Sequence, residues 1–135
     1  MDFNALRIML ERHEGNRPFP YVDTAGKVTI GIGHNLTDDG ITPDQATMFY
    51  DSDLDAVIRD LQSFPWWDSL SDERQQAIAD MRFNLGRDGF REFRKMIHAL
   101  AIGDFQSAAL EMRQSRWAIQ VGNRAEELAQ MVEHG

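Results

Sequence analysis

Two carboxylates and one hydroxyl lie close together in the first thirty residues of the chain. Glu14 ends a predicted helix, Asp23 precedes a predicted turn, and Thr29 lies on the strand that follows. If the helix packs beside this hairpin, Glu14 and Asp23 can face each other across one surface. Hydrolysis of a glycosidic bond needs such a pair, because one carboxyl group must protonate the leaving oxygen while an ionised one activates water or stabilises positive charge.

Each of these residues also has an ordinary structural interpretation. Glutamate can end a solvated helix, aspartate forms turns, and threonine favours strands. The strand itself is less ordinary, because Thr29 shares its face with Gly31 and Gly33 while the opposite face is apolar. The missing side chains leave room for a ligand to lie against the backbone. The coincidence of the three residues on one surface therefore favours a site.

The sequence lacks the residues that several other kinds of catalytic or binding site require. The chain has no cysteine, which excludes disulfides, thiolate zinc sites and cysteine nucleophiles. Its four histidines form no HExxH pair, and no GxSxG segment is present. Gly31 and Gly33 resemble half of a dinucleotide-binding loop, but Leu36 stands where the third glycine belongs. We therefore expect neither a metal nor a cofactor.

Length and charge narrow the function classes further. A chain of 135 residues fits one domain, and 14 basic against 22 acidic residues give a net charge of −8. That charge argues against nucleic-acid binding, which needs a cationic surface. No apolar run approaches the roughly 20 residues of a membrane span, and the first residues lack the pattern of a signal peptide. We expect a soluble acidic domain without an export signal.

The elements that must position the candidate residues follow from sequence periodicity. Apolar residues at helical spacing predict a first helix that begins after an N-cap at Asp2 and stops near Glu14, where Gly15 and two nearby prolines end it. From 21 to 33 the period becomes two, and the break at 24–26 predicts a hairpin. Further helices are predicted over 42–61, 71–86, 90–101, 104–113 and 123–133. The predicted fold class is α+β, mostly helical with a small antiparallel sheet near the N-terminus.

Three sequence segments carry a resemblance to a known family. They are Glu14-Gly15, the run from Tyr21 to Gly26 (YVDTAG), and the run from Val28 to His34 (VTIGIGH). Together they resemble the T-even phage lysozyme family, the muramidase endolysins of glycoside hydrolase family twenty-four. The spacing of that family, Glu, eight residues, Asp or Cys, five residues, Thr, is met without a gap. Further landmarks extend the resemblance over nearly the whole chain: 68–70, 81–86, 115–117 and 123–124.

The resemblance implies a fold and a reaction. The fold would be lysozyme-like, with two lobes around a cleft within a single lysozyme domain, 1–135. The N-lobe would span about 14–60 with the hairpin, and the C-lobe about 61–135 together with helix 1–13. The implied reaction is hydrolysis of the β-1,4 bond between N-acetylmuramic acid and N-acetylglucosamine in bacterial peptidoglycan.

The resemblance also implies roles for the three candidate residues. Glu14 would be the general acid, Asp23 would work with the attacking water or the oxocarbenium charge, and Thr29 would position that water. The family inverts configuration, which requires carboxyl groups about 6.5–9.5 Å apart.

Other positions take binding or structural roles from the same resemblance. Five residues are expected to bind substrate: Gly31, Gly33, Asn35, Phe83 and Arg124. Arg124 resembles the arginine that pairs with the catalytic glutamate, and Phe83 is either a wall of the cleft or an ordinary core residue. His34 and Asp53 resemble a structural ion pair.

Two alternatives remain open at this stage. A lytic transglycosylase needs a single acidic residue, so the presence of Asp23 and Thr29 favours hydrolysis. A catalytically inactive peptidoglycan-binding module would not need the intact trio.

The resemblance further implies partners and a location. It implies a bacteriolytic enzyme, a monomer bound to peptidoglycan strands without nucleic acid or stable membrane insertion. Such an enzyme is held in the host bacterial cytoplasm and reaches the periplasmic wall through a holin.

Overall fold

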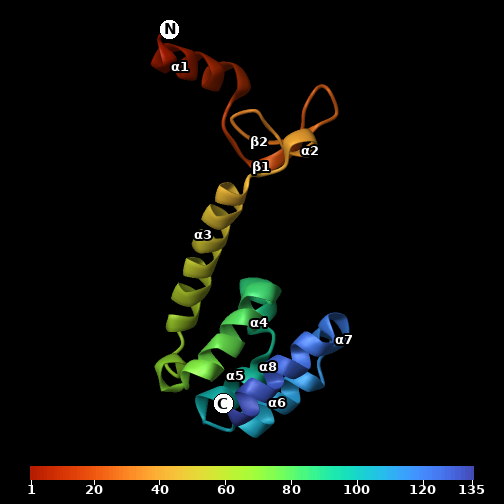
Figure 1. Cartoon of the computed structure of the whole chain (residues 1–135). Coiled ribbons are helices and arrows are strands. Elements are labelled where there is room, and N and C mark those ends of the chain that lie inside the picture. The colour runs from red at the N-terminus through yellow and green to blue at the C-terminus, as the bar shows by residue number, and fades with distance from the viewer. The chain divides into compact units, whose positions relative to one another are not determined.

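A computed structural model describes all residues, 1–135 (Figure 1). The chain folds as two compact units, 1–48 and 49–135, each of which is described by itself. The first unit carries the small sheet, and the second is helical. This arrangement confirms the predicted fold class, mostly helical with a three-stranded antiparallel sheet near the N-terminus.

The first unit begins with helix α1 (Phe3–Glu14). The side chain of Asp2 caps this helix by accepting a hydrogen bond from the backbone N–H of Ala5 at 3.0 Å. Gly15 ends it, since its φ of 75° suits glycine and its N–H donates to the carbonyl of Glu11 at 2.8 Å. The predicted start and end of the first helix are both confirmed.

Three antiparallel strands follow in the spatial order β1 (Arg17–Val22), β2 (Val28–Gly31) and β3 (His34–Asn35). Thr29 lies opposite Tyr21 on one side and Asn35 on the other. The prediction of a hairpin is confirmed, but β1 begins four residues earlier than predicted, within the proline-containing segment. Prolines are tolerated there because β1 is an edge strand with an irregular register between Arg17 and Tyr21. The short helix α2 (Leu36–Asp39) completes the sheet region.

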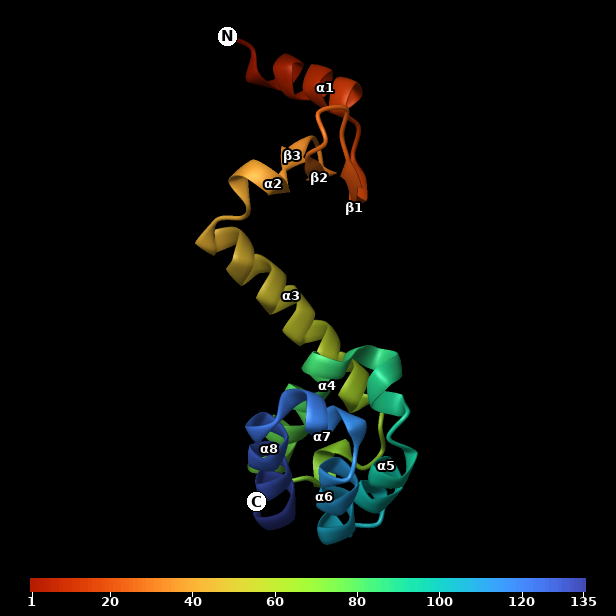
Figure 2. The same cartoon turned by 90° about the vertical axis from the view of Figure 1, so that its right-hand side faces the viewer.

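The second unit is built from helices, which Figure 2 shows from a second side. Helix α3 (Pro43–Gln62) starts before the boundary of the units and leads into it. The others are η1 (Trp67–Ser69), α4 (Asp72–Arg91), α5 (Arg94–Ala101), α6 (Phe105–Arg113), α7 (Arg116–Val121) and α8 (Asn123–His134). The six-residue α7 was not predicted.

Helix α4 continues beyond the residue at which the sequence predicts its end. The predicted stop at Gly86 marks a real break, because Gly86 has φ 79° and ψ 170° inside the helix. The chain nevertheless resumes helical geometry beyond it and continues to Arg91. The helix is therefore two segments joined at a glycine, a common cause of a sharp kink.

The hydrophobic core lies entirely within the second unit. Its largest fully buried side chains are Leu61, Ile78, Met81, Phe90, Met96, Leu100, Met112 and Val132. The guanidinium of Arg74 donates hydrogen bonds to the carbonyls of Val132 and Glu133 at 2.7 and 3.3 Å. These bonds satisfy carbonyls at the end of α8 that have no partner within the helix.

Candidate active site

Glu14 is held where α1 meets the turn between β2 and β3. A Cβ atom built on Gly33 would lie only 2.8 Å from Glu14 Oε2 and 2.9 Å from Glu14 Cδ. Gly33 also has a φ of 67°, which other residues rarely adopt. The carboxyl group therefore lies directly over the backbone of Gly33, and glycine is required there for both conformation and space.

Asp23 is fixed by the hairpin turn between β1 and β2. Its Oδ1 accepts hydrogen bonds from the N–H groups of Ala25 and Lys27, both at 2.9 Å. Such bonds from an aspartate to its own turn are a usual way of holding a turn in place. Its Oδ2 remains free of backbone bonds and lies 3.5 Å from the hydroxyl of Thr29.

Thr29 is the one buried polar residue of the first unit, with 3% of its surface exposed. Its hydroxyl donates to the carbonyl of Lys27 at 3.0 Å, the shorter of its two contacts. The structure thus brings Thr29 and Asp23 together on the sheet that also holds Glu14 over Gly33.

Gly31 and Asn35 differ in what surrounds them. A Cβ atom at Gly31 would have no neighbour within 4 Å, so the space above this residue is open. Both polar atoms of the Asn35 side chain are engaged with Asp38, as Oδ1 accepts from its N–H at 3.0 Å and Nδ2 donates to its carboxylate at 2.9 Å. Asn35 is therefore the N-cap of α2, and its role in binding substrate stays a prediction.

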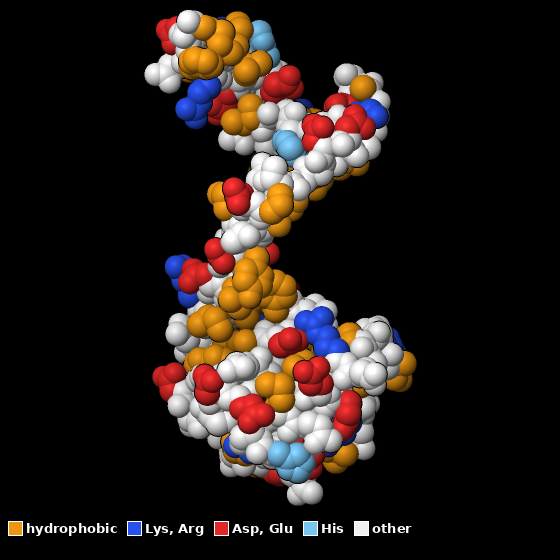
Figure 3. Space-filling model, viewed as in Figure 1, with side chains coloured by type: hydrophobic (Ala, Val, Ile, Leu, Met, Phe, Trp, Pro, Cys, Tyr) orange, Lys and Arg blue, Asp and Glu red, His pale blue; other side chains and the backbone are white.

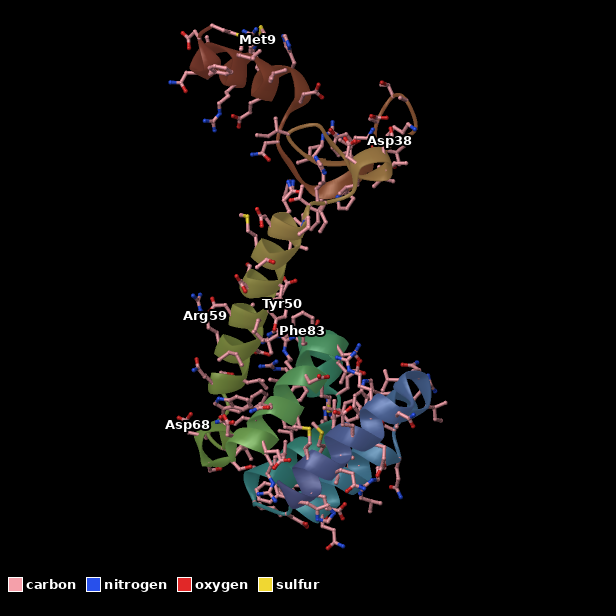
Figure 4. All side chains as sticks on the ribbon, in the orientation of Figure 1. Met9, Asp38, Tyr50, Arg59, Asp68 and Phe83 are labelled. Atoms are coloured by element: carbon pink, nitrogen blue, oxygen red, sulfur yellow. The ribbon has the colours of Figure 1, made fainter.

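Phe83 lines a cavity of about 730 Å³ in the second unit. It is 40% exposed, which excludes the interpretation as an ordinary core residue. Its ring centroid lies 6.2 Å from that of Tyr50, and the two side chains point toward one another (Figure 4). Hydrophobic side chains gather on the second half of α3 beside this cavity (Figure 3). An aromatic wall of this kind suits the apolar face of a ring-shaped ligand.

Arg124 lies at the start of α8 and lines the same cavity. Its Nε and Nη2 lie 2.9 and 2.7 Å from Oδ1 of Asp80 on α4. Asp80 is thus the carboxylate partner of Arg124 within the second unit, and the pairing with Glu14 stays a prediction. His34 Nε2 lies 2.6 Å from the carbonyl of Gly40, so within the first unit this side chain binds the segment after α2.

Comparison with known proteins identifies the family. The phage lysozyme family matches residues 11–133, which includes Glu14, Asp23 and Thr29. This chain belongs to the phage lysozyme family. The match also covers both units and all the residues expected to bind substrate.

Several individual proteins are similar to most of this chain. The pre-baseplate central spike protein Gp5 of Enterobacteria phage T4 is 30% identical over 92% of this chain, which spans only 27% of that protein. A probable T4-type lysozyme of Dictyostelium discoideum is 25% identical over 98% of this chain and 95% of its own length. An endolysin of Acyrthosiphon pisum secondary endosymbiont phage 1 is 32% identical over 77% of this chain and 72% of its own length.

The sequence did not predict two residues that contact the expected binding residues of this phage lysozyme. Tyr50 faces Phe83 across the cavity, and Asp80 holds Arg124. A signal for Asp80 exists in the sequence, because residues three apart lie on the same face of a helix and Asp80 precedes Phe83 by three. No group of three or more histidine, aspartate or glutamate side chains is arranged to hold a metal ion. None of the helices combines the length and the apolar character needed to span a membrane.

Proposed function

We propose that this protein is a phage-type endolysin that hydrolyses β-1,4 bonds between N-acetylmuramic acid and N-acetylglucosamine in peptidoglycan. The observation that carries the proposal is the placement of Glu14 over Gly33, on the same sheet as the Asp23–Thr29 contact. Membership of the phage lysozyme family supports the substrate class.

Each of the three residues takes one role in the proposed reaction. Glu14, in its protonated form, donates to the glycosidic oxygen as the bond to the anomeric carbon breaks. Asp23 uses its Oδ2, which the backbone bonds of the turn leave open, to take a proton from the attacking water. The hydroxyl of Thr29, 3.5 Å from that oxygen, positions the same water.

The proposed stereochemistry is inversion. A water molecule must then fit between Asp23 and the sugar, opposite Glu14. This requirement predicts a carboxyl separation of about 6.5–9.5 Å in the working enzyme, whereas retention requires about 5–5.5 Å. The turn bonds to Asp23 Oδ1 support the assignment, because they fix the carboxylate and leave Oδ2 for water.

Five residues are proposed to bind the glycan. Gly31 and Gly33 offer bare backbone, and Asn35 lies opposite Thr29 on β3. Phe83 and Arg124 offer an aromatic face and a cation beside the cavity of the second unit. We propose a single lysozyme domain, with an N-lobe of about 14–60 and a C-lobe of about 61–135 that includes helix 1–13.

We propose a biological setting that follows from the reaction. The protein acts as a monomer in host-cell lysis, is made in the host bacterial cytoplasm, and reaches the periplasmic wall through a holin. Its similarity to an endolysin supports this setting. The net charge of −8 predicts that salt favours its approach to an anionic wall, because salt screens like-charge repulsion.

The products of peptidoglycan digestion test the reaction. Purified peptidoglycan is digested in water enriched in oxygen-18, and the fragments are analysed by mass spectrometry. Hydrolysis predicts a reducing N-acetylmuramic acid end carrying one labelled oxygen. An unlabelled 1,6-anhydro end would replace the assignment with lytic transglycosylase, and binding without fragments would indicate an inactive binding module.

A further inference from the structure

The carboxylate of Asp60, on α3, is surrounded by arginines from α4. Arg91 binds it with both nitrogens of its fork, Nη1 at 2.8 Å from Oδ2 and Nη2 at 2.6 Å from Oδ1. Arg82 Nε donates to Oδ2 at 2.6 Å. The Asp60 side chain is only 12% exposed, and hydrogen bonds from Arg91 and then Arg82 lower its pKa to about 2. Asp60 is therefore ionised at any ordinary pH and hydrogen-bonded by two arginines, with the exposed Arg87 farther away, its Nε 3.8 Å from Oδ1.

The two arginines come from opposite sides of the break in α4. Arg82 precedes Gly86 and Arg91 follows it, so one carboxylate connects both helical segments. A glycine with a φ of 79° does not by itself fix the angle between the segments it joins, because glycine is conformationally permissive. A bidentate Arg–carboxylate pair does constrain direction, since its two parallel bonds require one relative orientation.

The segment between the two arginines carries residues of the proposed site. Phe83, which follows Arg82 directly, lines the cavity of about 730 Å³. Asn84 accepts a hydrogen bond from the indole N–H of Trp117 at 2.8 Å. Both residues precede Gly86, in the helical segment that Asp60 holds directly through Arg82, whereas Arg91 ties the segment after Gly86 to the same carboxylate.

We propose that Asp60 is a positioning residue that joins the two segments of α4 and, through Arg82, places Phe83 for binding the glycan. The inference rests on the proposed function for its substrate, but the geometry on which it depends lies wholly within the second unit. Asp60 itself neither lines the cavity nor acts on the reacting atoms.

A purely stabilising role makes a different prediction. A buried ion cluster contributes little net stability compared with well-packed hydrophobic residues, which often replace it without loss. A protein in which Asp60, Arg82 and Arg91 are all apolar can thus remain stable while losing the directional contacts. Stability and positioning can therefore be separated by mutation.

The first test uses the Trp117 indole as a reporter in nuclear magnetic resonance of the full chain. Asp60→Asn is expected to move the indole N–H resonance of Trp117, because the segment that carries Asn84 shifts. Asp55→Asn is the matched control, since it removes an exposed ion pair with Arg59 on the same helix and touches nothing on α4. Asp60→Glu should return the resonance toward its original position. An indole resonance that is unchanged in Asp60→Asn would overturn the proposal.

The second test measures peptidoglycan digestion at varied substrate concentration. Asp60→Asn should raise the apparent KM on the order of tenfold while kcat changes little, the signature of weakened binding rather than altered chemistry. If that variant does not fold, the triple variant Asp60→Leu, Arg82→Met, Arg91→Met replaces it, with the same expected KM. A triple variant with unchanged KM would show that Asp60 serves stability alone. If the wild-type protein does not digest peptidoglycan, the proposed function fails, and the indole resonance still decides the role of Asp60.

Discussion

The two units of this chain differ in what holds them together. In the first, residues 1–48, Thr29 is the only buried residue, and hydrophobic side chains such as Phe3, Ile8 and Phe19 are mostly exposed. In the second, residues 49–135, a continuous core is formed by all the buried hydrophobic side chains of the chain. The proposed catalytic trio lies in the unit without such a core.

This difference shows how the proposed catalytic residues are placed. A segment of this size cannot rely on burial for its geometry. It relies on local devices instead: the turn bonds of Asp23, the positive φ of Gly33, and the cap of α1 by Asp2. We therefore expect substitutions that disturb these local devices to change mainly activity, and substitutions in the hydrophobic core of the second unit to change mainly stability.

The largest expected effect on stability comes from the core. Phe90→Ala removes a fully buried ring and is expected to lower the free energy of unfolding by about 3–5 kcal/mol. Phe19→Ala, at a residue that is 79% exposed, should change it by less than about 0.5 kcal/mol. Urea unfolding followed by tryptophan fluorescence measures both, since all three tryptophans lie in the second unit. Equal losses from the two variants would contradict the comparison.

The next effect is on activity. In Gly33→Ala the new methyl group would lie 2.8 Å from Glu14 Oε2, so the carboxyl group must move. Misplacement of a reacting group by about 1 Å can cost on the order of 100-fold in rate, and we expect a loss of that size in peptidoglycan digestion. Gly40→Ala is the control, because it introduces backbone strain of the same kind at a φ of 57° in the same unit with no neighbour within 4 Å. A similar loss of activity in both variants would point to strain rather than to Glu14.

A smaller effect concerns the dependence of stability on pH. The pKa of Asp60 is lowered from 3.8 to about 2 in the folded state, chiefly by the hydrogen bond from Arg91. A carboxyl group whose pKa is lower in the folded state stabilises the fold at any pH above its pKa in the unfolded chain. As the pH falls from roughly 4 to 2, Asp60 becomes protonated, and about 2 kcal/mol of the free energy of unfolding is lost. Asp60→Asn should therefore reduce the free energy of unfolding at neutral pH and flatten its decline in acid. Parallel pH profiles for the two proteins would exclude this contribution.

The smallest expected effects on stability come from removing two helix caps, one in each unit. Ser71 caps α4 by accepting from the N–H of Arg74, and Ser71→Ala should cost about 1 kcal/mol in the fluorescence-detected transition. Asn35 caps the four-residue α2 in the first unit, and Asn35→Ala should change that transition by less than about 0.5 kcal/mol. If Asn35→Ala cost as much as Ser71→Ala, the cap of α2 would be as important to the cooperative fold as that of α4.

Local patterns made much of the fold predictable. The cap at Asp2, the stop at Gly15 and the turn after Asp23 depend on neighbouring residues, and the structure has each of them. Residue types and spacing also singled out Glu14, Asp23 and Thr29, for which the resemblance implied roles, and the structure brings Asp23 and Thr29 into contact.

Features that depend on distant residues were not predictable. The partners of Asp60 lie 22 and 31 positions away, and the pair of Arg124 with Asp80 spans 44 positions. Charges at such separations leave no periodicity in the sequence. The start of β1 was missed for another reason, because prolines that end a helix are also tolerated in an edge strand.

The most direct test of the account compares two glutamates of α1. Glu14→Gln and Glu11→Gln each remove one carboxylate from the same helix, but only Glu14 lies over Gly33. The initial rate of reducing-end release from purified peptidoglycan should fall by about a thousandfold or more in Glu14→Gln, the size of a lost general acid, with unchanged unfolding. Glu11→Gln should retain the wild-type rate. A Glu14→Gln protein that digests peptidoglycan as fast as Glu11→Gln would contradict the assignment of the catalytic acid.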